Sequence, residues 1–463
     1  MIFALIVVPV LGLFFGVHRY LWCRLVRDTT TPGSRPRRTG TVAAFVLPLT
    51  TLATLLAARA GAPFPLQQAL AWPGYLWLAL VLYLTLALLV GEVVRAICLR
   101  ALPDREPPER TPSPTGPARG TGPQSPPPPP DRSPDPPPDS SPNPSPELPP
   151  TPSPTPSPTP SPTPSPTPSS GSSPTLLPPR TPALPPVATP PRRLFLARAV
   201  AAGASLAATA AVGYGTYTTL RGPVVKRVTI PLAKLPRKAH GFRIAVVSDI
   251  HLGPILGRAH TRRVVETINR THPDLVAIVG DLVDGNVTDL APAAEPLREL
   301  RSRHGAFFVT GNHEYYSGAD QWVDHVRELG IHPLENARIE LPGFDLAGIN
   351  DVAGQTERAG PDYDQALGDR DPARAVVLMA HQPVTIHDTV RYGVDLQLSG
   401  HTHGGQMWPF TYIADATNPT IAGLERYGDT QLYVSRGAGT WGPPVRLGAP
   451  PDITVVELAS LRA

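Results

Sequence analysis

Cysteine is almost absent from this sequence. Among 463 residues there are two cysteines, Cys23 and Cys98, and both lie in or beside apolar stretches near the N-terminus. The C-terminal half therefore has no disulfide and no thiolate metal site. Any metal ion bound in that half must be held by histidine, carboxylate or amide side chains.

Excess charge is also scarce. The formal net charge is only +4, and the basic residues are dispersed along the chain. This charge is too mild and too dispersed to indicate the basic surface of a nucleic-acid-binding protein, so no nucleic-acid partner is expected.

Charged residues are missing from three apolar runs in the first 100 residues, at 1–17, 41–58 and 75–90. Each run is close to the length that a helix needs to cross a bilayer core of roughly 30 Å. We therefore predict a membrane region over 1–100 with about three transmembrane helices, the last two joined by an uncharged loop at 61–74. A signal peptide is disfavoured because no basic residue precedes the first run. The remaining alternative is a buried helical hairpin.

Arginine placement predicts the orientation of these helices. The loop after the first run is rich in arginine, whereas the loop after the second carries no charge. Because arginine and lysine accumulate in cytoplasmic loops, the first loop is predicted to be cytoplasmic and the second to lie outside.

Proline is abundant, with 63 residues concentrated in the middle of the chain, including a tandem Thr-Pro-Ser-Pro run over 151–168. Such a density of proline excludes helices and central strands, and the segment has few large apolar residues to bury. We predict a disordered linker over 101–192 with polyproline II bias. It is interpreted as a spacer, and the alternative is a docking site for proline-reading domains.

A fourth apolar run follows the linker, at 197–217, directly after Arg192-Arg193-Leu194-Phe195-Leu196. Residues 193–220 are predicted to form either a fourth transmembrane helix or a twin-arginine-like signal anchor, with small residues near Ala210 as a cleavage site. Both interpretations place the remaining chain outside the cytoplasm.

Residues 221–463 have the pattern of an α/β domain, in which strand-length apolar runs alternate with helix-period stretches. Strands are expected at 243–248, 275–279, 306–310, 346–349, 376–379, 394–398, 431–435 and 453–458. Helices are expected at 261–270, 291–301 and 321–329.

Polar side chains follow five of these predicted strands where each one ends. They are Asp249 and His251, Asp281 and Asp284, Asn312 and His313, His381, and finally His401 and His403. Ligands of open α/β sheets bind at the carboxyl ends of the strands, so these side chains are expected at one site.

The donor atoms in this set are imidazole nitrogens and hard oxygens, which suit Mn, Fe or Zn better than Mg or Ca. All of these residues except Asp284 and His313 are candidate ligands. These seven are too many for one ion, but two ions that share a carboxylate can use them. Each signal is weak alone, because His381 could be an ordinary buried histidine and Asn312 or Asp284 a turn residue.

Together the strings Asp249-Ile250-His251, Gly280–Asp284, Gly311–Glu314, His381 and Gly400–His403 resemble the calcineurin-like metallophosphoesterase superfamily. The longer string to Gln406, and the tail Ser435–Gly439 with Pro444 and Arg446, resemble its membrane-associated or exported bacterial branch. The resemblance covers about residues 225–460. It implies a two-sheet αββα sandwich over 221–463.

The resemblance also implies roles for the candidate residues. Asp249, His251 and His403 would hold one divalent metal, and Asn312, His381 and His401 a second, with Asp281 bridging both. His313 would act as a general acid or charge stabiliser near the leaving group, oriented by Asp284.

The two histidines of the last string would thus bind different metals. Alternate side chains of an extended segment point the same way, which would let His401 and His403 reach a shared centre. Thr402 would then face away, and Gly404 and Gly405 would keep the mouth open for a phosphate.

The expected function is that of a membrane-tethered phosphoesterase with two metals, in which a metal-bridging hydroxide attacks phosphorus in line. A preference for phosphodiesters, an extracytoplasmic catalytic domain at the cell membrane and a lipid-linked substrate are further expectations. The alternative is a membrane scaffold whose proline tract recruits partners and whose metal-binding module is not catalytic.

Overall fold

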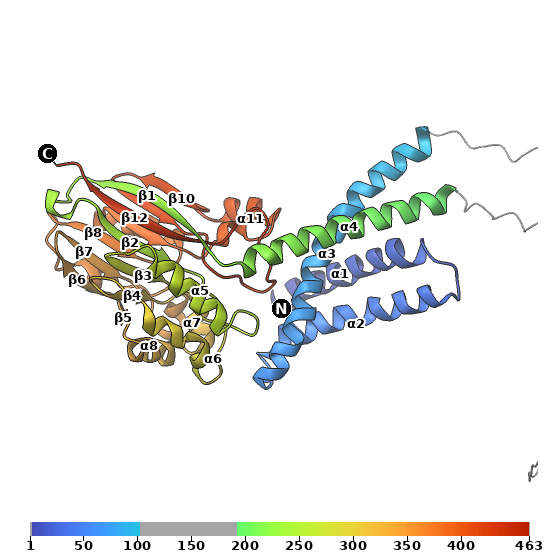
Figure 1. The fold of residues 1–463 in the computed structure, drawn as a ribbon, viewed down its shortest axis with the longest axis horizontal. Helices are drawn as coiled ribbons and strands as arrows, with labels where there is room; N and C mark the ends of the chain where they lie inside the picture. The colour runs from blue at the N-terminus through green and yellow to red at the C-terminus, as the bar shows by residue number, and fades with distance from the viewer. Residues whose placement is uncertain (1, 102–191, 463) are drawn as a thin grey trace, which may run out of the picture. The chain divides into compact units, whose positions relative to one another are not determined.

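The computed structural model describes residues 2–101 and 192–462. The predicted proline-rich linker lies outside the described residues. Four long helices and one α/β domain make up the described part of the chain (Figure 1).

The four long helices correspond to the predicted apolar runs. They are α1 (Ile2–Trp22), α2 (Arg35–Ala57), α3 (Phe64–Ala101) and α4 (Arg192–Leu220). The last three are long and apolar enough to cross a membrane. The first run forms α1, whose assignment as a membrane span stays a prediction.

The prediction of a loop over 61–74 is wrong for most of that range, because α3 already begins at Phe64. Pro65 lies in the first turn, where its missing N–H costs no intrahelical hydrogen bond. At about 1.5 Å per residue, the 38 residues of α3 are nearly twice as long as a bilayer core is thick.

Arginine-bearing ends of these helices lie together. Arg24 forms an ion pair with Glu92 of α3, and Arg192 at the start of α4 donates a hydrogen bond to the Cys98 carbonyl at the end of α3. The Arg198 side chain reaches the carbonyl of Thr29 in the loop before α2. A shared basic end is what the positive-inside rule favours for the cytoplasmic side of a membrane protein.

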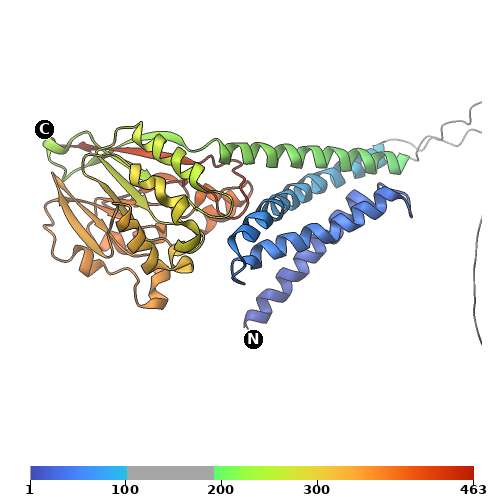
Figure 2. The same ribbon diagram turned by 60° about the horizontal axis from the view of Figure 1, so that its bottom comes forward.

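Two six-stranded sheets form the α/β domain (Figures 1 and 2). The first has the order β1 (Val224–Leu232), β12 (Asp452–Ser460), β2 (Phe242–Val247), β3 (Leu275–Val279), β4 (Ala306–Val309) and β5 (His332–Pro333). The second has the order β10 (Gly423–Tyr427), β11 (Thr430–Val434), β9 (Leu396–Ser399), β8 (Ala375–Met379), β7 (Phe344–Gly348) and β6 (Ala337–Leu341). Strands β2 to β5 are parallel, and so are β7, β8, β9 and β11.

The main core lies between the two sheets, where alternate residues of both sheets face each other. Ile244 and Val246 of β2 pack in one cluster with Leu346 of β7 and Val377 of β8. Burial of such side chains contributes roughly 1.5–3 kcal/mol each. Strands buried on both faces explain the uninterrupted apolar runs of the sequence.

Helices cover the outer faces of both sheets. Helices α5 (Arg258–Asn269), α6 (Val287–Ala294) and α8 (Ala319–Glu328) pack on the first sheet, and α9 (Tyr363–Leu367) packs on the second. The layers are therefore helix, sheet, sheet and helix, and the predicted two-sheet sandwich is confirmed.

One predicted helix is interrupted. The stretch 291–301 was expected to be a single helix, but α6 ends at Ala294 and a 3₁₀ turn, η3 (Glu295–Glu299), follows. Pro296 explains the break, because its ring removes a backbone donor and clashes with the preceding turn of an α-helix.

Candidate metal centre

The predicted site residues all lie where parallel strands end. Asp249 and His251 follow β2, Asp281 follows β3, and Asn312 begins the short helix α7 (Asn312–Ser317) after β4. From the second sheet, His381 follows β8, and His401 and His403 follow β9. The structure brings these side chains from both sheets together at one edge of the sandwich.

One group consists of Asp249, His251 and His403, whose ligand atoms lie within 4.8 Å of one another. Nε2 of His403 is 3.4 Å from Oδ1 of Asp249 and 2.9 Å from Nε2 of His251. All three residues are buried. Two imidazole nitrogens and a carboxylate facing one point are a donor set for a divalent metal.

A second group consists of Asp281, His381 and His401. Nε2 of His381 is 3.1 Å from Oδ2 of Asp281, and Nδ1 of His401 is 3.1 Å from Oδ1 of Asn312. Oδ2 of Asp281 is also 3.8 Å from Nε2 of His251 in the first group. Asp281 thus stands between the two groups.

His313 and Asp284 lie beside these groups. Oδ1 of Asp284 is 2.7 Å from Nδ1 of His313 and 2.8 Å from Nδ1 of His251. One carboxylate therefore orients two imidazoles, which leaves Nε2 of His251 directed at the first group. The His313 side chain is 16% exposed, so it can be reached from solvent.

The backbone of the candidate ligands is unusual. Asp249, His251, Asp281, His401 and His403 all have positive φ, between 50° and 71°. Residues other than glycine rarely adopt this region, and such residues concentrate at functional sites.

The left-handed backbone corrects the expectation that His401 and His403 alternate along an extended segment. Both lie in tight turns after β9, and His403 begins the 3₁₀ turn η7 (His403–Gly405). Turns rather than strand alternation bring the two rings toward the site. Thr402 does face away, since its hydroxyl donates to the Ile421 carbonyl.

The glycines of this turn serve close packing. A Cβ on Gly400 would lie 2.5 Å from Oδ2 of Asp249, and a Cβ on Gly405 would clash with the backbone of Thr411 in α11 (Phe410–Thr417). The absence of a side chain at position 400 lets the N–H of His401 donate to Asp249 at 3.0 Å. The expectation that Gly404 and Gly405 keep an open mouth is therefore wrong for Gly405.

The residues present fit divalent metals. Nδ1 of His381 is 2.8 Å from the Val279 carbonyl, so it carries the proton, and the buried Nε2 has no hydrogen-bond partner in the described chain. A buried nitrogen lone pair without a partner, directed at a carboxylate, is suited to a metal ion.

The electrostatic interactions of Asp281 and His381 also favour a positive charge beside the Asp281 carboxylate. Burial opposes ionisation of Asp281, but the charges of His381 and His251 outweigh it and hold the pKa of Asp281 well below its usual value. Burial likewise opposes a charged His381, and the Asp281 carboxylate nevertheless raises the pKa of His381. The site thus favours positive charge beside the Asp281 carboxylate, which a bound cation can supply while Nε2 of His381 keeps its lone pair.

Sequence reasoning assigned no role to Glu314, which is fully buried beneath the site. Its carboxylate accepts hydrogen bonds from the backbone N–H groups of Asp281, Leu282 and Gly311, at 3.0, 2.8 and 2.6 Å. Burial and then the charge of Asp281 raise the pKa of Glu314 to about 7. A glutamate three residues after Gly311, at the start of a helix, is a capping signal that the sequence does contain.

Arg446 is a second residue without a predicted role. Its guanidinium is buried and donates to the carbonyls of His403 and Arg436, both at 2.8 Å, and of Gly439. Nη2 of Arg446 is also 3.0 Å from Nδ1 of His403. Burial, followed by the Arg446 charge, keeps the pKa of His403 well below its ordinary value, so the ring stays neutral.

Replacement of Arg446 by lysine should weaken metal binding. Lysine keeps the charge but cannot reproduce the planar fork that fixes both the backbone and the ring of His403. We expect the metal concentration for half-maximal activity to rise about 10–100-fold, as for other residues that orient a ligand. Thermal melting would establish that the variant is folded. An unchanged metal requirement in a folded variant would contradict this role.

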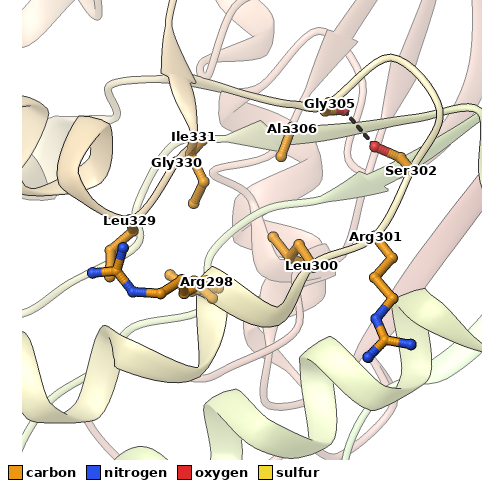
Figure 3. Close-up of a pocket in the computed structure, with 10 residues that line it drawn as sticks. Arg298, Leu300, Arg301, Ser302, Gly305, Ala306, Leu329, Gly330 and Ile331 are labelled. Carbon is orange, nitrogen blue, oxygen red and sulfur yellow. Dashed lines mark hydrogen bonds between the residues drawn. The ribbon is translucent and has the colours of Figure 1, made fainter.

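A pocket of about 330 Å³ lies elsewhere in the domain (Figure 3). It is lined by residues of η3, the amino end of β4 and the end of α8, among them Leu297, Arg298 and Ile331. Since the candidate ligands follow the carboxyl ends of the strands, this pocket is separate from the metal centre.

Known proteins are similar to this chain in sequence. The family profile described as calcineurin-like phosphoesterase matches residues 242–405, which include every candidate ligand. An uncharacterized metallophosphoesterase of Helicobacter pylori J99 is 37% identical over 272 residues, covering 58% of this chain and 73% of that protein. The chain belongs to the calcineurin-like metallophosphoesterases.

Two further relatives have similar sequence identity to this metallophosphoesterase. An uncharacterized metallophosphoesterase of Aquifex aeolicus is 37% identical, over 50% of this chain and 91% of that protein. A Danio rerio protein named "Transmembrane protein with metallophosphoesterase domain" is 38% identical, over 53% of this chain and 59% of its own length. The similarity to the latter thus spans little more than half of that protein.

Proposed function

We propose that this metallophosphoesterase is a membrane-tethered hydrolase that uses two divalent metals and prefers phosphodiesters. The observation that carries the proposal is the position of Asp281, whose Oδ2 is 3.1 Å from Nε2 of His381 in one group and 3.8 Å from Nε2 of His251 in the other. Asp281 also forms a third group with His251 and His313. Paired metals serve phosphoester hydrolysis because they clamp the attacking and leaving oxygens of an in-line displacement.

Asp249, His251 and His403 would hold one metal, Asn312, His381 and His401 the other, and Asp281 would bridge them. When bound, Mn, Fe or Zn ions supply Lewis acidity that polarises the phosphoryl oxygens and acidifies water. The protein's part is to fix the ligands, through Asp284 on His251, the Val279 carbonyl on His381 and Arg446 on His403.

His313 is proposed to deliver a proton to the departing oxygen. Its Nδ1 is held by Asp284, so its Nε2 is left for the substrate. A side chain that is accessible and oriented by a carboxylate has the arrangement expected of a general acid.

The proposed tether is α4, retained as a membrane anchor. The backbone N–H of Arg446 donates to the carbonyl of Gly215 in α4 at 3.0 Å, and Val445 leaves no room for a Cβ on Gly215. Ala204 and Ala208, which precede the predicted cleavage site near Ala210, are buried in one cluster with Val445 of the catalytic domain. This packing supports an uncleaved α4, with the catalytic domain on the side opposite the basic helix ends. That side is proposed to be extracytoplasmic.

Metal removal and substrate comparison test the proposed function. The full-length protein, purified in detergent, is stripped with a chelator and reloaded with Mn, Fe or Zn. We expect turnover of bis-p-nitrophenyl phosphate to disappear and return with metal, and to exceed turnover of p-nitrophenyl phosphate. Metal binding without turnover of any phosphoester would overturn the proposal and favour the scaffold with a non-catalytic module.

A further inference from the structure

Large apolar side chains are exposed on α11 and on the residues just before it. Trp408, Phe410, Tyr412 and Ile413 are 47, 42, 69 and 59% exposed, and no residue of α11 is buried. Lysine and arginine are absent from this helix. Contiguous exposed apolar side chains of this kind mark an interaction surface on a soluble domain.

This surface begins where the catalytic domain packs on the membrane helices. Met407 and Val445 of the domain belong to one buried cluster with Tyr83 of α3 and Val212 of α4. The N–H of Trp408, the next residue, donates to the Leu447 carbonyl at 2.8 Å. In Figure 1, α11 lies beside the end of α4 that leads into β1.

Exposed aromatic side chains also flank the candidate active site. Trp441 is 61% exposed and its ring lies 5.9 Å from that of His313, while Tyr316 is 75% exposed with its ring at 5.5 Å. The Gln406 side chain ties the Trp441 loop to the start of this surface, by accepting from the Trp441 N–H and donating to its carbonyl. Exposed aromatic side chains thus lie both at α11 and beside the site, and Gln406 links the two segments that carry them.

We propose that the surface formed by Trp408, Phe410, Tyr412, Ile413, Trp441 and Tyr316 inserts into the headgroup region of the membrane that the long helices span. Its occupant is the lipid bilayer, because the surface is continuous with the packing of α3 and α4. Tryptophan and tyrosine favour this zone, since their rings are apolar and their polar tips stay hydrated. An amphipathic helix can lie in the same plane with its apolar side chains among the headgroups.

This placement identifies the substrate class, and that part rests on the proposed function. Aromatic side chains inserted into the bilayer would hold the metal centre at the depth of the lipid headgroups. A phosphoester at that depth can therefore bind to it. The substrate is therefore an amphiphile whose acyl chains stay in the bilayer while its phosphoester reaches His313 and the ligands.

Insertion is tested independently of catalysis. In the full chain with Cys23→Ala and Cys98→Ala, Tyr412→Cys is labelled with an environment-sensitive fluorophore and the protein is placed in phosphatidylcholine nanodiscs. Lipids with a nitroxide near the carbonyl should quench this label. The same label at Leu461→Cys, also an exposed apolar position, should not be quenched. Equal quenching at both positions, or none at 412, overturns the insertion and would leave a protein as the occupant.

The substrate class is tested with Tyr412→Asp combined with Ile413→Asp. Turnover of a phosphodiester lipid in vesicles should fall at least about tenfold, since loss of one buried apolar side chain already corresponds to that factor. Turnover of the soluble bis-p-nitrophenyl phosphate should not change, and Leu461→Asp should alter neither. Equal losses on both substrates, or no loss on vesicles, overturns the amphiphile assignment. Wild-type protein that hydrolyses no phosphoester would instead refute the proposed function, while the quenching result still decides insertion.

Discussion

Replacement of Asp281 by asparagine should abolish phosphoester hydrolysis and remove bound metal. The Asp281 carboxylate lies near both ligand groups, 3.1 Å from Nε2 of His381 and 3.8 Å from Nε2 of His251. An amide has the same shape but no negative charge, so it cannot bridge two cations. Metals supply several kcal/mol of transition-state stabilisation, and about 4 kcal/mol corresponds to a thousandfold loss of kcat/KM.

The fold should survive this substitution. The Asp281 carboxylate accepts a hydrogen bond from the backbone N–H of His313 at 2.9 Å, and an asparagine side-chain carbonyl can accept the same bond. Asp395→Asn is the matched control, because Asp395 is also buried but accepts from the Val376 N–H at the amino end of β8. Elemental analysis and steady-state kinetics are measured on both variants. Full metal occupancy and activity in Asp281→Asn would show that the two groups do not share this carboxylate.

Much of the site could be predicted from sequence because polar residues directly follow the apolar runs that form its strands. Asp249 and Asp281 follow neighbouring parallel strands of one sheet, β2 and β3, so they had to approach one another whatever their loops do. His381 follows β8 of the second sheet, and its approach depends on how the two sheets pack. The apolar runs of β3 and β8, both fully buried, are equally visible in the sequence. Both signals are local, whereas the packing of the two sheets that brings them together was expected only from the family resemblance.

Features that depend on distant contacts could not be predicted. Strand β1 is mostly exposed and pairs with β12, more than 200 residues away, so its pattern carries little signal. Arg446 contacts His403, which lies 43 positions earlier in the sequence, and the residues around Arg446 contain no signal that indicates this partner. The positive φ values of His401 and His403 arise from packing of the turn against Asp249 and α11, which overrides the alternation expected of an extended segment.

Replacement of His313 by alanine should slow hydrolysis by an amount that depends on the leaving group. General acid catalysis contributes about 10²–10⁴-fold when the departing oxygen needs a proton. An alkyl phosphodiester should lose about that much, whereas a p-nitrophenyl ester should lose far less, because nitrophenolate departs without protonation. The metal content should not change, since His313 is proposed not to be a ligand.

The Asp284→Asn variant tests the role of Asp284 in orienting imidazole rings, as distinct from the proton transfer proposed for His313. Asp284 contacts both His313 and His251, at 2.7 and 2.8 Å, so its loss should reproduce part of the leaving-group dependence and also weaken metal binding. His313→Ala should show the first effect without the second. Equal losses on alkyl and nitrophenyl esters in His313→Ala would instead mean that this imidazole stabilises charge on phosphorus. The proton for the leaving group would then have to come from another group, such as water.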